Sequence, residues 1–485
     1  MKVEAASARG WLRAVAAFCV GALGAATSVH AEERHDVERA AVPDGAIEYI
    51  MVIDLENESF STTFGPNSPA VYLNSTLLTQ GQLITNYFAT SHVSLGNYLA
   101  QVSGQAPTAS TNNDCINLAS LSHPPLAGGF TDVLPGDASD DQVSFPGQVV
   151  GDGCVYPGPR SPTGGVLTIG DQLDARHHDD GDERGEHHLR WRSYAEDMGN
   201  DPVRDYGTPD PMGGTTCAHA PIGGVDHSNS ATATDQYATR HNPFVYFHSV
   251  IDDQDRCDAH VVPLGSVAVT SSGPDVFRGH LSEDLRSLRT TPNFMFVTPN
   301  LCNDGHDATC AGVNVEGGKT GGLVGADLWL KHWMPLIFAS PAYRSGKMLV
   351  VLTFDEGGVG DARACPLANQ ADCASPTGPN VSNPGYSYLL GLFGVQKPPA
   401  TTFVYPGGGQ VGAVLFNKRF IQPGTVNTTG FYNHYSALRS YEDILGIHRG
   451  GNDGLGHLGF AAKPGLQPFG KDVFNRSDRC DAAEE

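Results

Sequence analysis

The sequence predicts an α/β fold in which a central, mostly parallel sheet is flanked by helices and long loops. Short apolar runs typical of buried strands alternate along the chain with segments of helical periodicity. Two apolar runs, at residues 47–55 and 347–354, end in the polar groups Glu56-Asn57-Glu58 and Asp355-Glu356. Carboxyl ends of parallel strands meet at one edge of a sheet, where ligands collect, so we expect these two ends to be neighbours.

The remaining elements follow in an order typical of a layered α/β protein. After the first strand we expect a helix near 73–78, a short strand at 83–88 and a helix at 97–103 that Gly104 closes. Residues 105–240 are rich in Gly, Pro, Asp and Ser and should form long loops. Further strands are predicted at 242–250, 293–298 and 386–395, and further helices at 281–288, 323–338 and 435–447.

The first 31 residues have the pattern of an export signal. Lys2, Arg9 and Arg13 accompany an apolar stretch at 14–26, and residues 29–31 (VHA) form a small-x-small cleavage site. We therefore predict a signal peptide at 1–31 and one secreted or periplasmic domain at 32–485. A retained anchor is the alternative, which the shortness of the apolar run disfavours. We expect no stable membrane anchor elsewhere.

The charge balance of the chain restricts its partners. The 485 residues carry a formal net charge of −23, which argues against nucleic acid or an anionic membrane as a general partner. Such a surface would also repel a phosphorylated substrate. Any activity on phosphate esters would therefore need strong local positive charge, which a bound metal ion could supply.

Cysteine usage agrees with export into an oxidising compartment. Ten cysteines are present, and Cys19 belongs to the predicted signal. Spacing favours four local disulfides and leaves Cys480 over; the pairs are Cys115–Cys154, Cys217–Cys257, Cys302–Cys310 and Cys365–Cys373. None of these spacings is typical of a zinc site, so we read the cysteines as structural.

Residues 171–190 (DQLDARHHDDGDERGEHHLR) are the most polar stretch of the chain. Their four histidines and many carboxylates could bind a metal ion. A solvated, mobile loop is the simpler interpretation of this composition, and we favour it.

A nucleophile candidate lies in residues 90–98 (TSHVSLGNY), directly before a predicted helix. Free N–H groups and the helix dipole at such a position favour a bound phosphate. Ser94 fits best, with Thr90 and Ser91 as alternatives. A serine before a helix is most often an N-cap, so the residue pattern alone leaves both roles open.

Seven segments resemble, in order, the motifs of the phosphoesterase family of bacterial acid phosphatases and phospholipases C. They cover most of residues 47–447 and are LENESFSTTFG (55–65), SHVSLGNYLAQVSG (91–104), RWRSYAEDM (190–198), RHNPFVYF (240–247), NFMFVTPNLCNDGHD (293–307), LTFDEGG (352–358) and HYSALRSYEDILGI (434–447). The family has the alkaline phosphatase-like α/β fold, so the resemblance implies that layered architecture here.

The resemblance also implies a metal site and a covalent mechanism. One divalent metal would be held by Glu56, Asn57, Asp355 and Glu356, with Ser94 as its remaining ligand. Ser94 would attack phosphorus and form a phosphoserine that water later hydrolyses. These oxygen-rich ligands suit calcium, magnesium or manganese better than zinc.

Other residues of the motifs are implied to contact the substrate. Asn97 would bond a phosphate oxygen, while His306 and His434 would stabilise the transition state or protonate the leaving group, a task that suits a protonated histidine. Asp304 and Asp307 would line the same side of the pocket. Two residues have both a substrate-binding and a structural interpretation, namely His92 and Asn303; three histidines are read as structural, namely His227, His241 and His248.

Two departures from the family pattern concern the pocket. Gly96 stands where proline is usual, which loosens the start of the helix. Glu58 stands where a basic residue is common, and we read it as a solvent-facing neighbour of the site. The second departure bears on substrate preference more than on the reaction.

These observations predict a secreted, metal-dependent phosphomonoesterase of the acid phosphatase kind. Its substrates would be phosphorylated small molecules or lipid headgroups, with phosphoinositides among the candidates. The alternative is a phospholipase C-type phosphodiesterase acting on phosphatidylcholine-like lipids. Family members of that kind are commonly longer at the C-terminus, whereas about forty residues follow position 447 here, so we prefer the monoesterase.

A third hypothesis is a function without catalysis. The chain could be an acidic secreted binding protein that keeps the fold and a structural calcium, with residues 171–186 as its working surface. The joint presence of nucleophile, metal ligands and pocket histidines disfavours this reading.

Overall fold

The computed structural model describes residues 39–108, 110–116, 129–135, 147–159, 161, 165–179, 189–358 and 407–476. Glu38–Glu485 form one compact unit. The predicted signal peptide, the strand at 386–395, the pair Cys365–Cys373 and Cys480 lie outside the described residues. Within these ranges, none of the helices combines the length and the apolar character needed to cross a bilayer.

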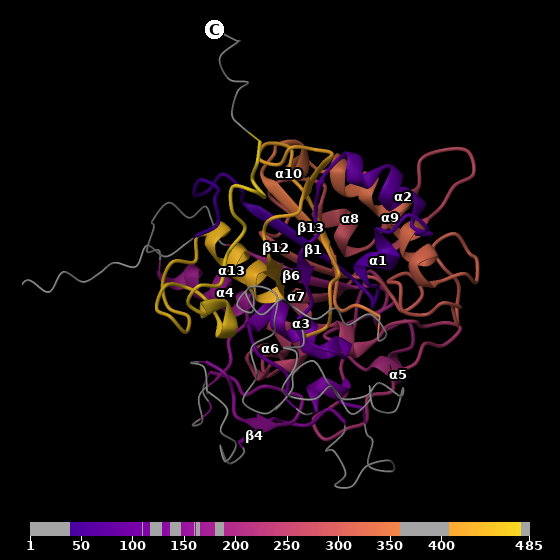
Figure 1. The fold of residues 1–485 in the computed structure, drawn as a ribbon. Coiled ribbons are helices and arrows are strands. Elements are labelled where there is room, and N and C mark those ends of the chain that lie inside the picture. The colour runs from indigo at the N-terminus through magenta and orange to yellow at the C-terminus, as the bar shows by residue number, and fades with distance from the viewer. Residues whose placement is uncertain are drawn as a thin grey trace, which may run out of the picture. The chain divides into compact units, whose positions relative to one another are not determined.

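The described part of the chain is organised around an eight-stranded sheet in the order β15-β2-β14-β13-β1-β12-β6-β9. Figure 1 shows helices on both sides of it. The strands are β1 (Tyr49–Leu55), β2 (Gln82–Ile84), β6 (Trp191–Ala195), β9 (Val261–Pro263), β12 (Phe294–Thr298), β13 (Met348–Phe354), β14 (Ala413–Phe416) and β15 (Thr425–Asn427). Only the pairings of β14 with β13 and with β2 are antiparallel among these strands. The predicted α/β class with a mostly parallel sheet is confirmed.

The two central strands explain why the sequence signal was strong. Every residue of β1 and β13 is buried, as continuous apolar runs predict for strands covered on both faces. The two strands pair in parallel from Tyr49↔Met348 to Leu55↔Phe354. Glu56 and Asp355 therefore leave the sheet side by side at the same edge.

Helices α3 (Ser94–Ser103) and α13 (His434–Ile444) pack against each other. Both cover one face of the sheet, because Tyr98 contacts Phe296 and Tyr441 contacts Phe294, two same-face residues of β12. Helix α9 (Gly322–Ala339) covers the opposite face, where Phe338 packs on Phe416 of β14. All ten residues of α3 are buried, and Gly104 ends the helix at φ +68°.

Shorter elements decorate this core. The helices are α1 (Phe60–Thr63), α2 (Val71–Ser75), α4 (Ile169–Asp179), α5 (Pro202–Asp205), α6 (His248–Ile251), α7 (Gln254–His260), α8 (His280–Asp284) and α10 (Pro341–Arg344), with 3₁₀ turns η1 (Leu77–Thr79), η2 (Thr111–Asn113), η3 (Thr239–His241), η4 (Pro243–Tyr246) and η6 (Gly459–Ala462). Two-stranded ribbons pair β3 (Tyr87–Phe88) with β16 (Tyr432–Asn433), β4 (Leu134–Pro135) with β5 (Gly151–Asp152), β7 (Thr208–Pro209) with β8 (Thr215–Thr216), and β10 (Ser266–Ala268) with β11 (Val276–Arg278).

Three of the predicted disulfides are present: Cys115–Cys154, Cys217–Cys257 and Cys302–Cys310. The first closes a loop within the predicted loop region at 105–240, and the second joins that region to α7. The third pins the segment that follows β12. The structure thus confirms three of the predicted local pairs, each of which anchors an irregular segment of the chain.

Two predicted elements were wrong. Residues 242–250 form η4 and α6 rather than a strand, because Pro243 stands in the first turn and favours a helical start. The first part of the acidic segment is helix α4 rather than a mobile loop; the hydroxyl and N–H of Thr168 bond Asp171 at its start, and Leu173 is buried. Residues 180–188 lie outside the described part of the chain.

Candidate active site

Glu56 is the centre of the candidate site. It follows β1 directly and is fully buried. One of its carboxylate oxygens, Oε2, accepts a hydrogen bond from Ser94 Oγ at 3.0 Å, and Oε1 accepts one from the Tyr98 hydroxyl at 2.6 Å. Residues four apart on a helix share a face, so α3 presents both hydroxyls to one carboxylate.

Ser94 is the first residue of α3, and it is not an N-cap. Val93 occupies the cap position without a side-chain bond. The free N–H of Leu95 is instead bonded by Asp114 Oδ1 at 2.8 Å, so a carboxylate from another loop satisfies the helix start. Burial raises the pKa of Asp114 to about 6, with the nearby Arg240 guanidinium opposing that rise.

The loop after β12 closes on the loop after β1. The Glu56 N–H donates to the carbonyl of Asp304 at 2.9 Å. Gly305 follows with φ +118°, and a Cβ there would lie 2.6 Å from the Glu56 carbonyl oxygen. Only glycine permits this approach, which delivers Asp304 to the site.

His241, at the end of η3, joins Glu56 and Asp304 in a buried cluster that could hold a metal ion. Its Nε2 lies 3.0 Å from Glu56 Oε1 and its Nδ1 lies 3.4 Å from Asp304 Oδ2. The ring also stacks on Tyr98, with centroids 5.2 Å apart. We read this histidine as structural from the sequence; the signal that could have found it is the RHNPFVYF motif.

Three buried carboxylates accumulate negative charge here. Burial raises the pKa of Glu56, Asp304 and Asp355 well above the ordinary range. Repulsion from Asp304 raises the pKa of Glu56 further, and repulsion from Glu56 does the same for Asp355. Burial, reinforced by the positive charge of Arg240, lowers the pKa of His241 well below its ordinary value.

The unpaired atoms of this cluster fit a bound cation. Among the described residues, Asp304 Oδ2, Asp355 Oδ2 and His241 Nε2 are buried and form no hydrogen bond. Two of them lie close to another polar atom of the cluster, Asp304 Oδ2 at 3.4 Å and His241 Nε2 at 3.0 Å. Buried polar atoms are normally paired, because leaving one unpaired costs about 1–3 kcal/mol. Carboxylate oxygens suit hard divalent cations, and the imidazole nitrogen widens the candidates to ions such as zinc.

The end of β13 supplies two predicted ligands, Asp355 and Glu356. Asp355 Oδ1 accepts a hydrogen bond from the Asn57 N–H at 3.3 Å. Glu356 Oε2 contacts His92 Nδ1, and both residues are buried. His92 therefore holds a predicted metal ligand in place in this structure. Glu58 is largely shielded from solvent, and burial raises its pKa to about 7.

His306 and Asp307 lie beside Arg240. His306 Nδ1 lies 2.8 Å from Asp307 Oδ1, and Arg240 Nη2 lies 3.4 Å from His306 Nε2. A guanidinium can only donate, so His306 Nε2 must accept and Nδ1–H must donate to Asp307. Arg240 is itself buried and extends its Nε toward Asp114 Oδ2 at 3.5 Å.

His434 differs from the protonated histidine expected from the sequence. Its ring is fully buried at the start of α13, where Nε2 bonds the Asp355 carbonyl at 2.7 Å and Nδ1 bonds the Tyr87 hydroxyl at 3.2 Å. Burial lowers the pKa of His434 to about 4. In this structure both ring nitrogens are engaged and the ring supports the backbone of Asp355, while the acid role of His434 stays a prediction.

The two predicted asparagines are engaged by the protein itself. Asn97 Oδ1 accepts hydrogen bonds from the N–H groups of Thr90 and Ser91 at 2.9 and 2.8 Å, and its amide donates to the Ser91 carbonyl. Asn303 donates to Glu196 at 3.0 Å and accepts from the Val315 N–H at 3.2 Å. Asn97 thus clamps the loop before Ser94, and Asn303 ties the loop after β12 to Glu196 and Val315. Their phosphate contacts stay predictions.

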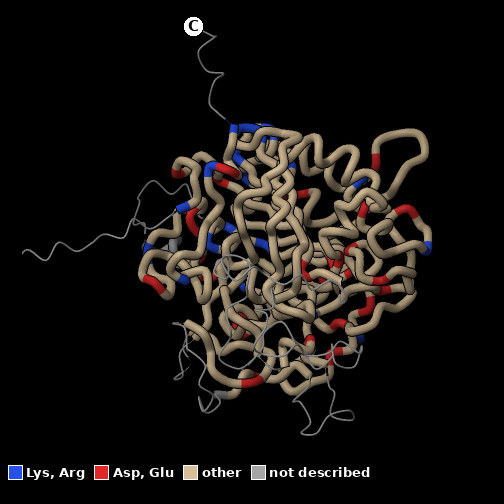
Figure 2. Tube along the Cα trace, viewed as in Figure 1, with Lys and Arg blue, Asp and Glu red and all other residues tan. Residues whose placement is uncertain are grey.

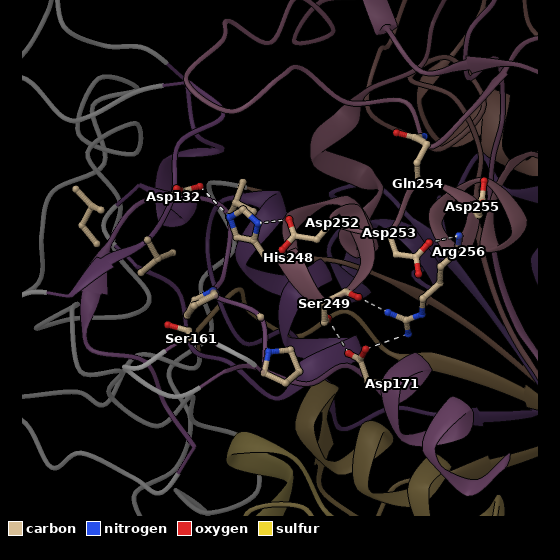
Figure 3. Close-up of a pocket in the computed structure, with 16 residues that line it drawn as sticks. Asp132, Ser161, Asp171, His248, Ser249, Asp252, Asp253, Gln254, Asp255 and Arg256 are labelled. Carbon is tan, nitrogen blue, oxygen red and sulfur yellow. Dashed lines mark hydrogen bonds and ion pairs between the residues drawn. The ribbon is translucent and has the colours of Figure 1, made fainter. Parts of the chain in front are cut away.

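A separate cavity of about 970 Å³ lies among α6, the start of α7 and the β4–β5 ribbon. Figure 3 shows His248 between Asp132 and Asp252, with Arg256 bound to Asp171 beside it. Its described lining includes none of the predicted site residues. The chemistry-bearing cluster is therefore the one at the carboxyl edge of the sheet.

Comparison with known proteins agrees with this geometry. The model of the phosphoesterase family matches residues 67–448. A phosphate-repressible acid phosphatase of Penicillium chrysogenum is 27% identical over 349 residues, which are 70% of this chain and 58% of that protein. A probable acid phosphatase of Kluyveromyces lactis is 25% identical over 327 residues, covering 67% and 50%. The chain thus spans about half the length of these curated relatives.

The solved structures that it is similar to are more distant. One is a protein in the alkaline phosphatase superfamily from Vibrio parahaemolyticus, with 10% identity and a TM-score of 0.40, over 84% of this chain and 69% of that one.

Proposed function

We propose that this chain, which belongs to the phosphoesterase family, is a metal-dependent phosphomonoesterase of the acid phosphatase kind. One observation carries the proposal: the Ser94 hydroxyl donates to Glu56 at 3.0 Å inside a buried cluster of carboxylates at the carboxyl edge of the sheet. The relatives named acid phosphatases support the same reaction class.

Ser94 is the nucleophile in this proposal. Its Oγ forms a bond to phosphorus while the bond from phosphorus to the leaving oxygen breaks, which gives a phosphoserine. The hydroxyl proton has an acceptor in place, because Glu56 Oε2 already receives the hydrogen bond. A water molecule then cleaves the phosphoserine and releases inorganic phosphate.

Other residues position the reacting groups. Tyr98 holds the second oxygen of Glu56, and Asn97 holds the loop before Ser94, so the hydroxyl and its acceptor are fixed before substrate arrives. The buried Arg240 beside His306 supplies positive charge near Glu56. Such preorganised charge is worth more in a water-poor site than in bulk water.

The cation would be held by Glu56, Asn57, Asp355, Glu356 and Ser94, with Asp304 and His241 offering further ligand atoms. When bound, it would offset the carboxylate charge, lower the pKa of the Ser94 hydroxyl and polarise a phosphoryl oxygen. Asp355 Oδ2 and Asp304 Oδ2, which form no hydrogen bond, support this assignment. The three disulfides support an exported location.

The test is phosphate release from a chromogenic phosphomonoester between acid and neutral pH, with and without chelator. Ser94→Ala should lower kcat by about 1,000-fold or more, as removal of other nucleophiles does. Ser103→Ala is the matched control, because Ser103 lies on the same helix and, within the described part of the chain, its hydroxyl bonds only the Leu99 carbonyl and the Gln105 N–H. Phosphate trapped on Ser94 and detected by mass spectrometry would establish the covalent step.

Other outcomes distinguish the rival functions. Cleavage of a choline phosphodiester without monoester hydrolysis would favour the phospholipase C-type reading. No turnover of either substrate with calcium, magnesium, manganese or zinc would favour a binding protein. If the Ser94→Ala variant is active and the Asp355→Asn variant is inactive, the metal-site assignment stands and the assignment of Ser94 as nucleophile is wrong.

A further inference from the structure

The edge of the sheet opposite the candidate site carries a concentration of positive charge. Arg190 precedes β6, Arg289 precedes β12, Arg344 precedes β13, and Lys418 and Arg419 follow the antiparallel strand β14. With Arg476, which bonds the Lys418 carbonyl, they form what we call the basic edge: Arg190, Arg289, Arg344, Lys418, Arg419 and Arg476. Figure 2 shows Lys and Arg gathered at the top of the molecule, where Figure 1 places α10.

All six side chains are exposed, and none forms an ion pair with a carboxylate in the described part of the chain. Backbone contacts hold two of them in place: Arg190 donates to the carbonyl of Thr291, and Arg476 donates to that of Lys418. The positive charges of these six side chains therefore face solvent.

Acidic residues near this edge do not cancel that charge, because other cations already pair with them. Glu48 pairs with Lys347 at 2.5 Å, and Asp284 pairs with Arg192 at 2.7 Å. Glu283 pairs with Arg286 at 2.6 Å. The basic edge is thus a local surplus on a chain whose formal net charge is −23.

The basic edge is an extended line rather than a pocket. It runs from β14 to β6 across five neighbouring strands, or about 20 Å at the usual spacing between strands. Arg419 closes on the loop before β13, since a Cβ on Gly346 would lie 3.1 Å from Arg419 Cβ. Leu288 is 40% exposed, and its carbonyl accepts from the Tyr49 hydroxyl at 3.1 Å, which places this apolar residue at the middle of the line.

We propose that the basic edge docks on a membrane surface that carries anionic phospholipid headgroups. A line of unpaired cations fits a plane of negative charge, and clusters of four to eight Lys or Arg are typical of such binding. An exposed leucine between the cations adds apolar contact at the headgroup boundary. The acidic remainder of the surface is repelled, so contact is restricted to this edge.

Docking in this way would orient the candidate site. Strand β1 is seven residues long, so Glu56 lies about 23 Å from the basic edge along the strand direction. The site would face away from the bilayer and meet water-borne phosphate esters rather than lipids of the same membrane. This orientation rests on the proposed function, whereas the docking itself does not.

The test is co-sedimentation of the full chain with vesicles at low and high salt. We expect binding to vesicles of equal parts phosphatidylglycerol and phosphatidylcholine at 20 mM salt, little binding to pure phosphatidylcholine, and loss of binding near 0.5 M salt. The double variant Lys418→Glu/Arg419→Glu should bind at least tenfold more weakly.

The matched control is Arg278→Glu/Arg449→Glu, which changes the net charge equally at two exposed positions outside the basic edge. It should keep the wild-type affinity within about threefold, which allows for its added long-range repulsion. Equal loss in both double variants would show a general charge effect and overturn the assigned surface. Absence of binding to anionic vesicles, or tighter binding to soluble polyglutamate or duplex DNA than to vesicles, would overturn the membrane as partner. Phosphatase activity is assayed separately, so its absence leaves this readout intact.

Discussion

The two edges of the central sheet handle charge in opposite ways. At the carboxyl edge, Glu56, Asp304 and Asp355 are buried, and one carboxylate oxygen each of Asp304 and Asp355 forms no hydrogen bond. At the opposite end of the strands, the six Lys and Arg side chains of the basic edge are exposed to solvent. Burying a carboxylate costs free energy unless a partner compensates it, whereas an exposed cation costs little. The comparison indicates where a bound cation would offset buried charge and where the charge is already solvated.

The largest effect should come from Glu56→Gln. This change removes the acceptor of the Ser94 hydroxyl and one predicted metal ligand, so kcat should fall by about 1,000-fold. Without metal, however, the variant should melt about 1–2 °C higher than the wild type, because a repelled buried charge has been removed. Thermal melts with and without manganese would check this. If the variant melts at a lower temperature than the wild type in chelator, the uncompensated charge of Glu56 does not destabilise the metal-free protein.

His241→Asn should give the next largest effect. The imidazole contacts Glu56 and Asp304, so its loss should weaken metal binding or activity by about 10- to 100-fold. Activity measured across a metal titration separates these two effects. His227→Asn is the control, since His227 is exposed and packs only near Tyr206; similar losses in both variants would argue against a site role for His241.

His457 sharpens the contrast between paired and unpaired buried groups. Although burial alone lowers the pKa of a histidine, hydrogen bonds to Asp443 at 3.1 Å and Asp453 at 2.6 Å raise the pKa of His457 overall. A raised folded-state pKa contributes stability that is complete below the unfolded-state pKa and is lost as pH rises through the folded-state pKa. His457→Gln should therefore cost about 2 kcal/mol near pH 5.

The same variant should cost less at a pH above the folded-state pKa of His457, where the wild-type ring has lost its proton. Urea unfolding at both pH values would measure the difference. A loss that is independent of pH would mean that the packing of the ring, rather than its charge, stabilises this region.

The smallest effect should come from Arg344→Gln on the basic edge. Exposed side chains without ion pairs contribute little to stability, so the free energy of unfolding should change by less than about 0.5 kcal/mol. Phosphatase activity should also be unchanged. Denaturant unfolding checks this expectation, and a loss above 1 kcal/mol would mean that the basic edge has a structural role.

Local patterns in the sequence determined the frame of this protein. The apolar runs before Glu56 and Asp355 predicted two buried parallel strands, and the structure places their ends together. The helix predicted at 97–103 and closed by Gly104 is present, and in the structure it begins three residues earlier, at Ser94. Three local disulfides followed from cysteine spacing. Each of these signals lies within a short window, where backbone preference and burial act directly.

The tertiary structure alone decided which side chains surround Glu56 and what each one does. His241 and Arg240 come from η3, which lies just before the residues 242–250 that were predicted as a strand. Asn97 and His434 belong to the expected motifs, yet their hydrogen bonds go to other groups of the protein itself. Side-chain direction and burial depend on packing between segments hundreds of residues apart. That is why the sequence predicted the residues near the site, while the structure was needed to separate those that face Glu56 from those that support it.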